Sequence, residues 1–192
     1  MIFKKIAQTI LLLFVCNISN ADSLSIFGGK SMDSNLIDFP KKAVEGNLDI
    51  ERYKIFALAY QQSIKPPSVF KKLNTNIEYI YARHSPDHVS ETALAYNVTS
   101  SSFNILYTNV RLGVSVGLSY VYGEPTFEDG TKNEPNKKYR LLNYNAYEIS
   151  LLDDIEQSSI FLRIHHRSGV YGLIAPQHVG SNFITAGLRY YF

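Results

Sequence analysis

The stretch SNFITAGLRYYF, residues 181–192, decides the fold of this chain. Its residues fall alternately into two sets. Ile184, Ala186, Leu188, Tyr190 and Phe192 form an apolar set, and Ser181, Phe183, Thr185, Gly187, Arg189 and Tyr191 form a mixed set. Alternation with a period of two predicts a β-strand, because successive side chains point to opposite faces. One face of this strand is therefore apolar, and the other is largely polar.

The same alternation recurs in residues 111–122, where leucine, valine and tyrosine alternate with arginine, glycine and serine. A soluble sandwich would bury the apolar face in a core, whereas a membrane barrel would turn it toward lipid and fill its interior with the other face. The chain ends in Phe192, and apolar or aromatic residues occupy every second position before it. This ending resembles the assembly signal of bacterial outer-membrane barrels and favours the barrel over the sandwich.

Eight strands are expected, over residues 23–32, 52–63, 72–83, 90–98, 107–122, 139–152, 159–170 and 182–192. An even number of strands closes without an exposed edge. Connections 33–51, 84–89, 123–138 and 171–181 are expected on the outer side, and shorter ones such as SSSFN and DDIEQS on the periplasmic side. The predicted fold is therefore all-β, an eight-stranded antiparallel transmembrane β-barrel of the outer-membrane type, formed by residues 22–192 as one domain.

Residues 1–21 are expected to be a cleaved secretory signal peptide, with two lysines, a largely apolar run from Ile6 to Val15 and a small-residue end at Ala21. A lipoprotein signal ending at Cys16 is the less favoured interpretation, because Val15 is not small. Cleavage would remove the only cysteine and leave 17 of the 19 basic residues against 17 acidic ones. The remaining balance gives no argument for nucleic-acid binding, and a chain without cysteine cannot form disulfides.

The turn DDIEQS fixes how two predicted strands pair, because it sets Leu152 opposite Ser159. Apolar residues then oppose apolar residues, and Asn145 lies beside His166 and Asn143 beside Ser168 on the outward face. On the inward face Glu148 lies opposite Arg163.

Several charged residues are expected to face the interior of the barrel: Arg163, His165, Arg167, Glu148, Arg111, Arg189, Glu78 and Glu91. A barrel of eight strands is filled by its own side chains, so a hydrogen-bonded ionic network is favoured over catalysis for them.

His166 and Ser168 share the lipid-facing stripe with Ile160, Leu162 and Ile164. Polar side chains at that face lose their hydrogen bonds to water, which is unfavourable, so their presence requires an explanation. They could simply reach the hydrated headgroup region. Alternatively, a serine nucleophile and a histidine base lie two residues apart on one face of a strand, where they can act together on a lipid ester.

Four segments resemble the lipid A 3-O-deacylases, which are eight-stranded outer-membrane barrels, and particularly the acyloxyacyl-hydrolase-like proteins related to them. These are GLSYVYGEPTFED at 117–129, LLNYNAYEISL at 141–151, LRIHHRSGVYGL at 162–173 and GSNFITAGLRYYF at 180–192. The similarity extends over about residues 70–192. In that family a His-x-Ser motif on the seventh strand supplies base and nucleophile, so the resemblance implies these roles for His166 and Ser168. It also implies lipopolysaccharide as partner and ester hydrolysis as activity.

The sequence departs from the family pattern at two positions. Gly169 replaces the usual asparagine after the serine, and Ser181 replaces the glutamate at the start of the last strand. Asn145 and Ser181 are the candidates for a neutral orienting group, and the backbone N–H groups near Gly169 or Gly172 for stabilising the oxyanion. The missing acid favours the alternative, a non-enzymatic structural or adhesion protein of the cell surface.

No cofactor or metal is expected. His84, His88 and His178 lie in or beside predicted loops without the spacing of zinc ligands, which favours solvated side chains. A porin is not favoured, because eight strands leave no aqueous channel.

Overall fold

The computed structural model describes residues 22–33, 36, 38–128, 137–152, 157–176 and 179–192. The expected signal peptide, residues 1–21, lies outside the described residues, and so do His178 and most of the DDIEQS turn. Among the residues that are described, no helix is both long and apolar enough to cross a bilayer.

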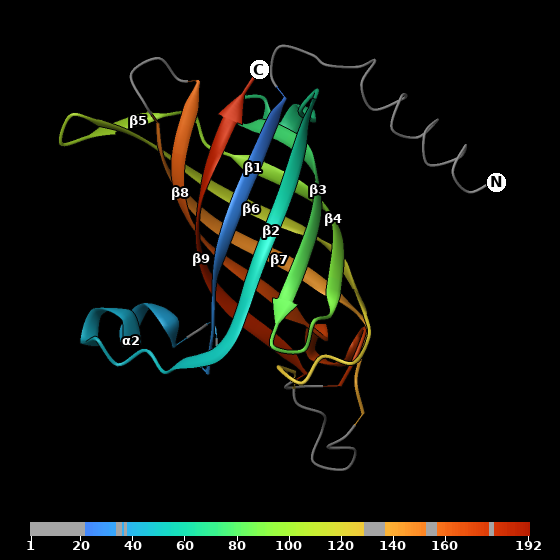
Figure 1. Ribbon diagram of the computed structural model, residues 1–192. Coiled ribbons are helices and arrows are strands. Elements are labelled where there is room, and N and C mark those ends of the chain that lie inside the picture. The colour runs from blue at the N-terminus through green and yellow to red at the C-terminus, as the bar shows by residue number, and fades with distance from the viewer. Residues whose placement is uncertain (1–21, 34–35, 37, 129–136, 153–156, 177–178) are drawn as a thin grey trace.

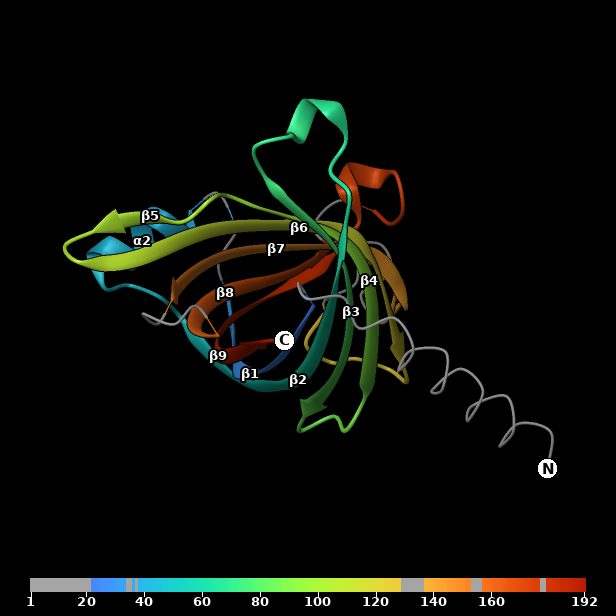
Figure 2. The same ribbon diagram turned by 90° about the horizontal axis from the view of Figure 1, so that it is seen from above.

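The chain forms a closed antiparallel barrel of eight strands, with a ninth short strand on its rim. The barrel strands are β1 (Ser23–Met32), β2 (Ile50–Ile64), β3 (Asn74–Ser85), β4 (Ser90–Thr99), β6 (Thr108–Tyr122), β7 (Leu141–Leu152), β8 (Ser158–Ser168) and β9 (Gly180–Tyr191). Neighbours in sequence pair with each other, and β9 pairs with β1 to complete the ring, which Figure 2 shows from above. The predicted fold class is confirmed.

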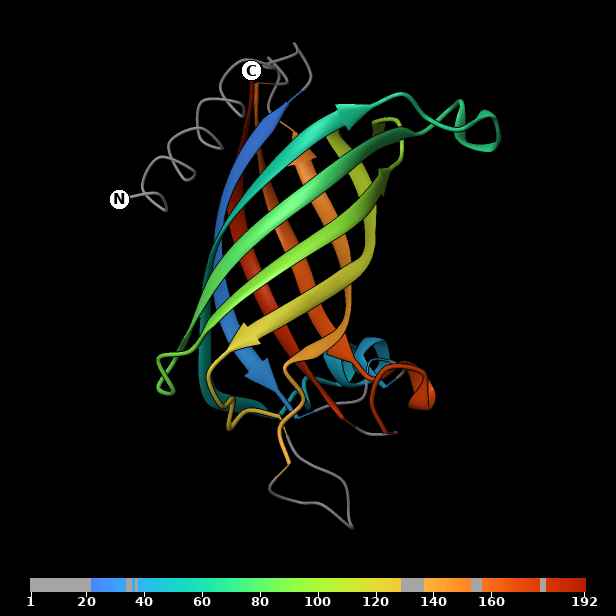
Figure 3. The same cartoon turned by 90° about the vertical axis from the view of Figure 1, so that its right-hand side faces the viewer.

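The pairing also fixes the slope of the strands. The offset is found by stepping from one outward-facing residue to its partner on the next strand, once around the barrel. Starting at Ser168 of β8, the partners are in turn Asn143, Leu118, Leu94, Tyr79, Tyr60, Leu24, Tyr190 and finally Ser158 of β8 again. This circuit returns to β8 ten residues from where it began, since 168 less 158 is 10. With strand spacings of about 4.8 Å and a rise of about 3.3 Å per residue, that offset corresponds to a tilt of about 40°. Figure 3 shows the strands slanting across the barrel wall.

The barrel is apolar outside and charged inside. Exposed aliphatic and aromatic side chains cover the outer wall, for example Leu24, Phe56, Leu94, Val116, Ile160 and Leu188, which are 52–58% exposed. Arg163, Arg167 and Arg189 are among the largest fully buried side chains. A soluble protein would show the reverse, so this distribution suits a wall that faces lipid.

The two ends of the barrel differ. The C-terminus and the start of β1 lie at one end of the barrel, the end that was predicted to face the periplasm (Figure 1). At the other end lies the helix α2 (Phe39–Glu45), which has a proline in its first turn and ends at Gly46 in a left-handed conformation, φ 70°. Thr126, Phe127 and Glu128, which follow β6, also pack at this outer end.

Most strand ends agree with the predicted ones within two residues, but one element was missed. β5 (Phe103–Ile105) lies within the connection predicted between the strands 90–98 and 107–122. It pairs with the start of β6 to form a hairpin that projects from the rim (Figure 2). Leu106 and Tyr107 form its tip with positive φ angles of 47° and 69°. Sequence patterns favour asparagine and glycine in such turns, so these residues gave no turn signal.

Candidate functional site

β8 presents two chemically different faces, as the alternation predicts. Its inward residues Arg163, His165 and Arg167 are buried, whereas His166 and Ser168 on the outward face are half-buried. The register with β7 is the predicted one, because Leu152 pairs with Ser159. The adjacent histidines therefore lie in separate environments.

Five polar side chains gather on the outer wall at the outer end of β7, β8 and β9. This polar patch consists of Asn143, Asn145, His166, Ser168 and Asn182. Asn145 and Asn182 lie on either side of His166 as its direct neighbours across β7 and β9, and Asn143 pairs with Ser168. Nearer the other end of these strands the outer wall carries exposed apolar side chains such as Ile160, Leu162 and Leu188, so the patch interrupts an apolar surface.

One hydrogen bond orients the imidazole of His166. Its Nδ1 lies 2.6 Å from Oδ1 of Asn182. An amide oxygen only accepts hydrogen bonds, so Nδ1 carries the proton and donates it. In the neutral ring Nε2 then has a free lone pair, which is the form that a general base requires.

Ser168 is the last residue of β8 and lies two residues beyond His166 on the same face. At about 3.3 Å per residue, their backbones are about 6–7 Å apart. Among the hydrogen bonds of the described residues, none joins the two side chains. Each side chain points outward, so both are placed to meet a substrate lying against the wall.

Three other predicted site residues are placed as follows. Ser181 is 7% exposed on the inner face, and its hydroxyl donates to Glu128, so this hydroxyl is not the group that orients His166. Gly169 donates its N–H to the carbonyl of Val179 at 3.1 Å, so that donor is already used. Asn145 lies beside His166, but the orienting bond comes from Asn182.

Gly172, the other glycine considered for the oxyanion, ends the short helix η2 (Val170–Gly172) with φ 101°. It lies in open space, with no atom within 4 Å of an added Cβ. It therefore remains at the exposed outer end, beyond the polar patch.

Sequence reasoning missed Asn182. The motif GSN drew attention to Ser181 because that position should hold an acid. Alternation did contain the signal: residues 182, 166 and 168 all have even numbers on strands whose even residues face outward. The exact partner depended on how β9 pairs with β8, which places Asn182 opposite His166.

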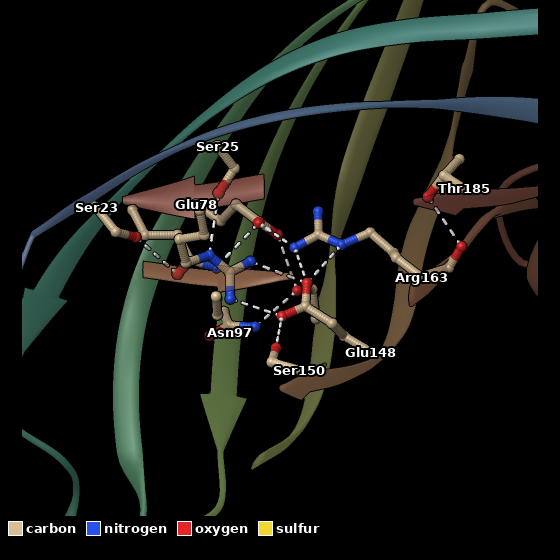
Figure 4. Close-up of polar contacts among 12 residues, drawn as sticks. Ser23, Ser25, Glu78, Asn97, Glu148, Ser150, Arg163 and Thr185 are labelled. Carbon is tan, nitrogen blue, oxygen red and sulfur yellow. Dashed lines mark hydrogen bonds and ion pairs between the residues drawn. The ribbon is translucent and has the colours of Figure 1, made fainter. Parts of the chain in front are cut away.

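The interior near the middle of the barrel holds an electroneutral quartet, formed by Glu78, Glu148, Arg163 and Arg189 (Figure 4). Glu148 accepts bonds of 2.6 and 2.9 Å from each of the two arginines, and Arg163 also donates to Glu78 at 2.7 Å. Two charges of each sign are thus brought together with their hydrogen bonds satisfied, which is the condition for burying charge. The predicted ionic network is present, and Glu148 lies on the face opposite His166.

A second buried cluster surrounds Glu91 nearer the outer end. His84 and His165 both donate from Nε2 to its carboxylate, at 2.8 and 3.0 Å, and Ser119 donates at 2.6 Å. The prediction of a solvated His84 was wrong: it is 2% exposed, because β3 extends two residues further than expected and the side chain points inward. His88 is exposed in its loop, as predicted.

A segment of the outer connection closes the mouth above this cluster. Phe127 stacks on His84 with ring centroids 4.5 Å apart, and Glu128, 1% exposed, bonds Arg167. Burial raises the pKa of the Glu128 carboxyl, although Arg167 opposes the shift. Phe127 and Glu128 therefore cover the buried cluster around Glu91 at the outer end of the barrel. In the described part of the chain, no three His, Cys, Asp or Glu side chains are grouped so as to hold a metal ion.

The chain matches no protein-family model and no curated protein sequence. Its structure is similar to the crystal structure of the outer membrane enzyme PagL, with a TM-score of 0.55 and 11% sequence identity over 88% of this chain and 99% of that chain. The outer membrane protein Ail of Yersinia pestis gives a TM-score of 0.39 and 15% identity over 90% of this chain and 100% of that one. At such identity the similarity to PagL bears on the fold alone: the chain has the fold of an eight-stranded outer-membrane β-barrel.

Proposed function

We propose that this protein is an outer-membrane esterase that removes an ester-linked acyl chain from lipid A, the membrane anchor of lipopolysaccharide. The observation that supports it most is the bond from His166 Nδ1 to Asn182 Oδ1, 2.6 Å long, on the lipid-facing wall. It leaves Nε2 of a neutral histidine free as a base beside an outward-facing serine. The resemblance of the HHRS segment to the lipid A 3-O-deacylases supports the same roles.

The proposed reaction is acyl transfer to water. Ser168 Oγ attacks the ester carbonyl carbon while its proton passes to His166 Nε2. The tetrahedral intermediate collapses with cleavage of the bond between the carbonyl carbon and the sugar oxygen. The protonated His166 gives its proton to this leaving oxygen, which becomes a hydroxyl, and the acyl group remains on Ser168. Water then attacks this ester with His166 again as base, which releases the fatty acid and restores the serine.

Asn182 takes the position of the acid in this mechanism. A neutral amide orients the histidine in papain-like proteases, so a carboxylate is not indispensable. The amide of Asn182 fixes the tautomer and the orientation of the His166 ring. It stabilises the protonated imidazolium less than a carboxylate would, so a slower enzyme is expected. The side-chain amide of Asn143, directly across from Ser168, is the proposed donor to the oxyanion, with Asn145 beside it.

The depth of the site fits this substrate class. Ser168 ends its strand at the outer side, where the ester bonds of an outer-leaflet lipid lie next to its headgroup. On the same wall Lys30 and Lys54 are exposed and directly opposed across β1 and β2. Like charges so placed repel each other, which an anionic headgroup would relieve. Export after removal of residues 1–21 is part of this proposal.

Mass spectrometry of lipid A from cells that produce the protein tests the proposal. Wild type is expected to remove one acyl chain, and Ser168→Ala and His166→Ala are expected to remove none. Ser158→Ala is the matched control, because it lies on the same outward face at the other end of β8. Unchanged lipid A in cells where wild type is folded in the outer membrane would contradict the esterase and favour a non-enzymatic surface protein.

A further inference from the structure

We infer that the β5–β6 hairpin is a membrane anchor, whose apolar tip inserts into the phospholipid headgroup region at the end of the barrel predicted to face the periplasm. The hairpin extends from Phe103 to Val110 and leaves the rim sideways, across the barrel axis rather than along it (Figure 1 and Figure 2). Its tip residues Leu106 and Tyr107 are 88% and 97% exposed. Two large side chains are thus presented to whatever surrounds the rim, and this holds with or without the proposed esterase activity.

The hairpin has one apolar and one polar face. Alternation along its two strands places four side chains on one face: Phe103, Ile105, Thr108 and Val110. Three of these four are apolar, and the opposite face carries the paired Asn104 and Asn109. A segment with two such faces suits the boundary between hydrocarbon and water.

The bend of β6 decides which face meets the bilayer. Val110 pairs with the outward-facing Leu151, and Leu112 follows it on the same side of β6. The apolar face of the hairpin therefore continues the lipid-facing wall. Where a strand turns away from the barrel at the rim, its outward face becomes the face turned toward the bilayer, and its inward face turns away from the bilayer. The apolar face of the hairpin thus meets lipid, and the asparagine face meets water.

The hairpin leaves the wall at the level of exposed aromatic side chains. A circuit of eight pairings returns to β8 after an offset of ten residues, about 25 Å along the barrel axis, so each pairing shifts the level by about 3 Å. Val110 lies two pairings from Ile160, which places it about 6 Å nearer the rim. Tyr190 pairs with Ser158, and the same geometry places it about 2 Å nearer the rim than Ile160. Phe192, two residues further along that face, lies about 7 Å nearer. Exposed aromatic rings mark the interface between hydrocarbon and headgroups, so the hairpin begins at this interface.

The turn consists of residues that its backbone conformation does not favour. Leu106 and Tyr107 have φ angles of 47° and 69°, a region that side chains other than those of asparagine and aspartate rarely adopt. Asn104 supports the turn, because its Oδ1 accepts the N–H of Tyr107 at 3.2 Å. Lipid contact explains these two side chains, since leucine favours hydrocarbon and a tyrosine ring with its hydroxyl suits the headgroup level. This contact offsets part of the unfavourable backbone energy.

A second projection from the same rim supplies positive charge beside the hairpin. It contains the short helix η1 (Ser68–Phe70), between β2 and β3, and the hydroxyl of Ser101 donates to the carbonyl of Lys72 at 3.2 Å. Lys65, Lys71 and Lys72 are exposed on this projection. Phospholipid phosphates are the anionic groups at this level, so these lysines favour a lipid surface as the partner.

Tryptophan fluorescence in vesicles of phosphatidylcholine and phosphatidylglycerol tests the inference. The natural chain has no tryptophan, so Tyr107→Trp introduces a single fluorophore at the tip. Phospholipid brominated near the headgroup should lower its emission about twofold, and phospholipid brominated near the end of the acyl chain should lower it less. Leu112→Trp, on the wall of the same strand, is the control for full lipid contact. Glu124→Trp, exposed beyond the other end of β6, is the control for water.

The quencher acrylamide, dissolved in the water, gives the complementary measurement. It should quench Tyr107→Trp severalfold less than Glu124→Trp. Equal quenching of the two by acrylamide, with no effect of bromine on Tyr107→Trp, would overturn the anchor. Protection from acrylamide that depends on the ratio of protein to lipid and not on bromine would also overturn it, because a second copy would then cover the tip. Leu106→Trp supplies a second tip position and should give the same results as Tyr107→Trp.

Discussion

Replacing Glu148 by glutamine tests the charge balance inside the barrel. The carboxylate accepts four bonds of 2.6–2.9 Å from Arg163 and Arg189. After the substitution Arg163 keeps the carboxylate of Glu78 as its partner, whereas Arg189 loses its carboxylate partner and is left with neutral acceptors, such as the hydroxyl of Ser25 at 3.0 Å. Removing one partner of a buried ion pair destabilises a folded protein by about 3–5 kcal/mol, because the remaining charge is buried without a counter-charge. We expect Glu148→Gln to lower the free energy of unfolding by this amount.

The double variant Glu148→Gln/Arg189→Met supplies the sharper comparison. It removes one charge of each sign and leaves Arg163 paired with Glu78. Its destabilisation should be at least about 2 kcal/mol smaller than the sum of the two single effects, since those two residues are coupled. Glu124→Gln, which changes an exposed carboxylate, should stay within about 0.5 kcal/mol of wild type.

Urea unfolding in lipid vesicles, followed by circular dichroism and heat-modifiable gel mobility, measures these values. A cost of Glu148→Gln below about 1 kcal/mol, or strict additivity in the double variant, would refute the quartet as the unit that balances the interior. Folded Glu148→Gln should also keep the ester hydrolysis rate of wild type. Loss of hydrolysis in the folded variant would show that Glu148 acts on His166 from within.

Three further predictions concern the site and the ends of the barrel. Asn182→Leu removes the acceptor of the His166 Nδ1 proton and should lower kcat/KM for ester hydrolysis about 100-fold. Asn182→Asp keeps an acceptor and should retain or raise kcat/KM. An equal loss of kcat/KM in both variants would contradict an orienting role. The double variant Leu106→Asn/Tyr107→Gly places residues that tolerate positive φ angles at the tip of the β5 hairpin. It should raise the free energy of unfolding in urea by about 1–2 kcal/mol. An unchanged free energy would show that the apolar side chains of the tip stabilise the protein by as much as the backbone strain destabilises it. Because the pKa of Glu128 is raised in the folded protein, its contribution to stability is full below about pH 4.5 and is lost as the pH rises through the raised value. Glu128→Gln should remove that pH dependence from unfolding curves, and an unchanged curve would contradict it.

The sequence by itself determined the barrel and the two faces of each strand. Alternation is a local property, since neighbouring side chains must point to opposite sides whatever lies beyond them. The short connection after Leu152 likewise fixed the pairing with Ser159, which put His166 and Ser168 outward and Arg163 inward before any distance was known. These conclusions needed no contact between distant segments.

The tertiary structure decided which residues meet across the closed ring. Asn182, rather than Ser181, reaches His166 because β9 pairs with β8 in one particular register. His84 is buried because a segment after β6 closes the mouth of the barrel, which brings Phe127 onto its ring.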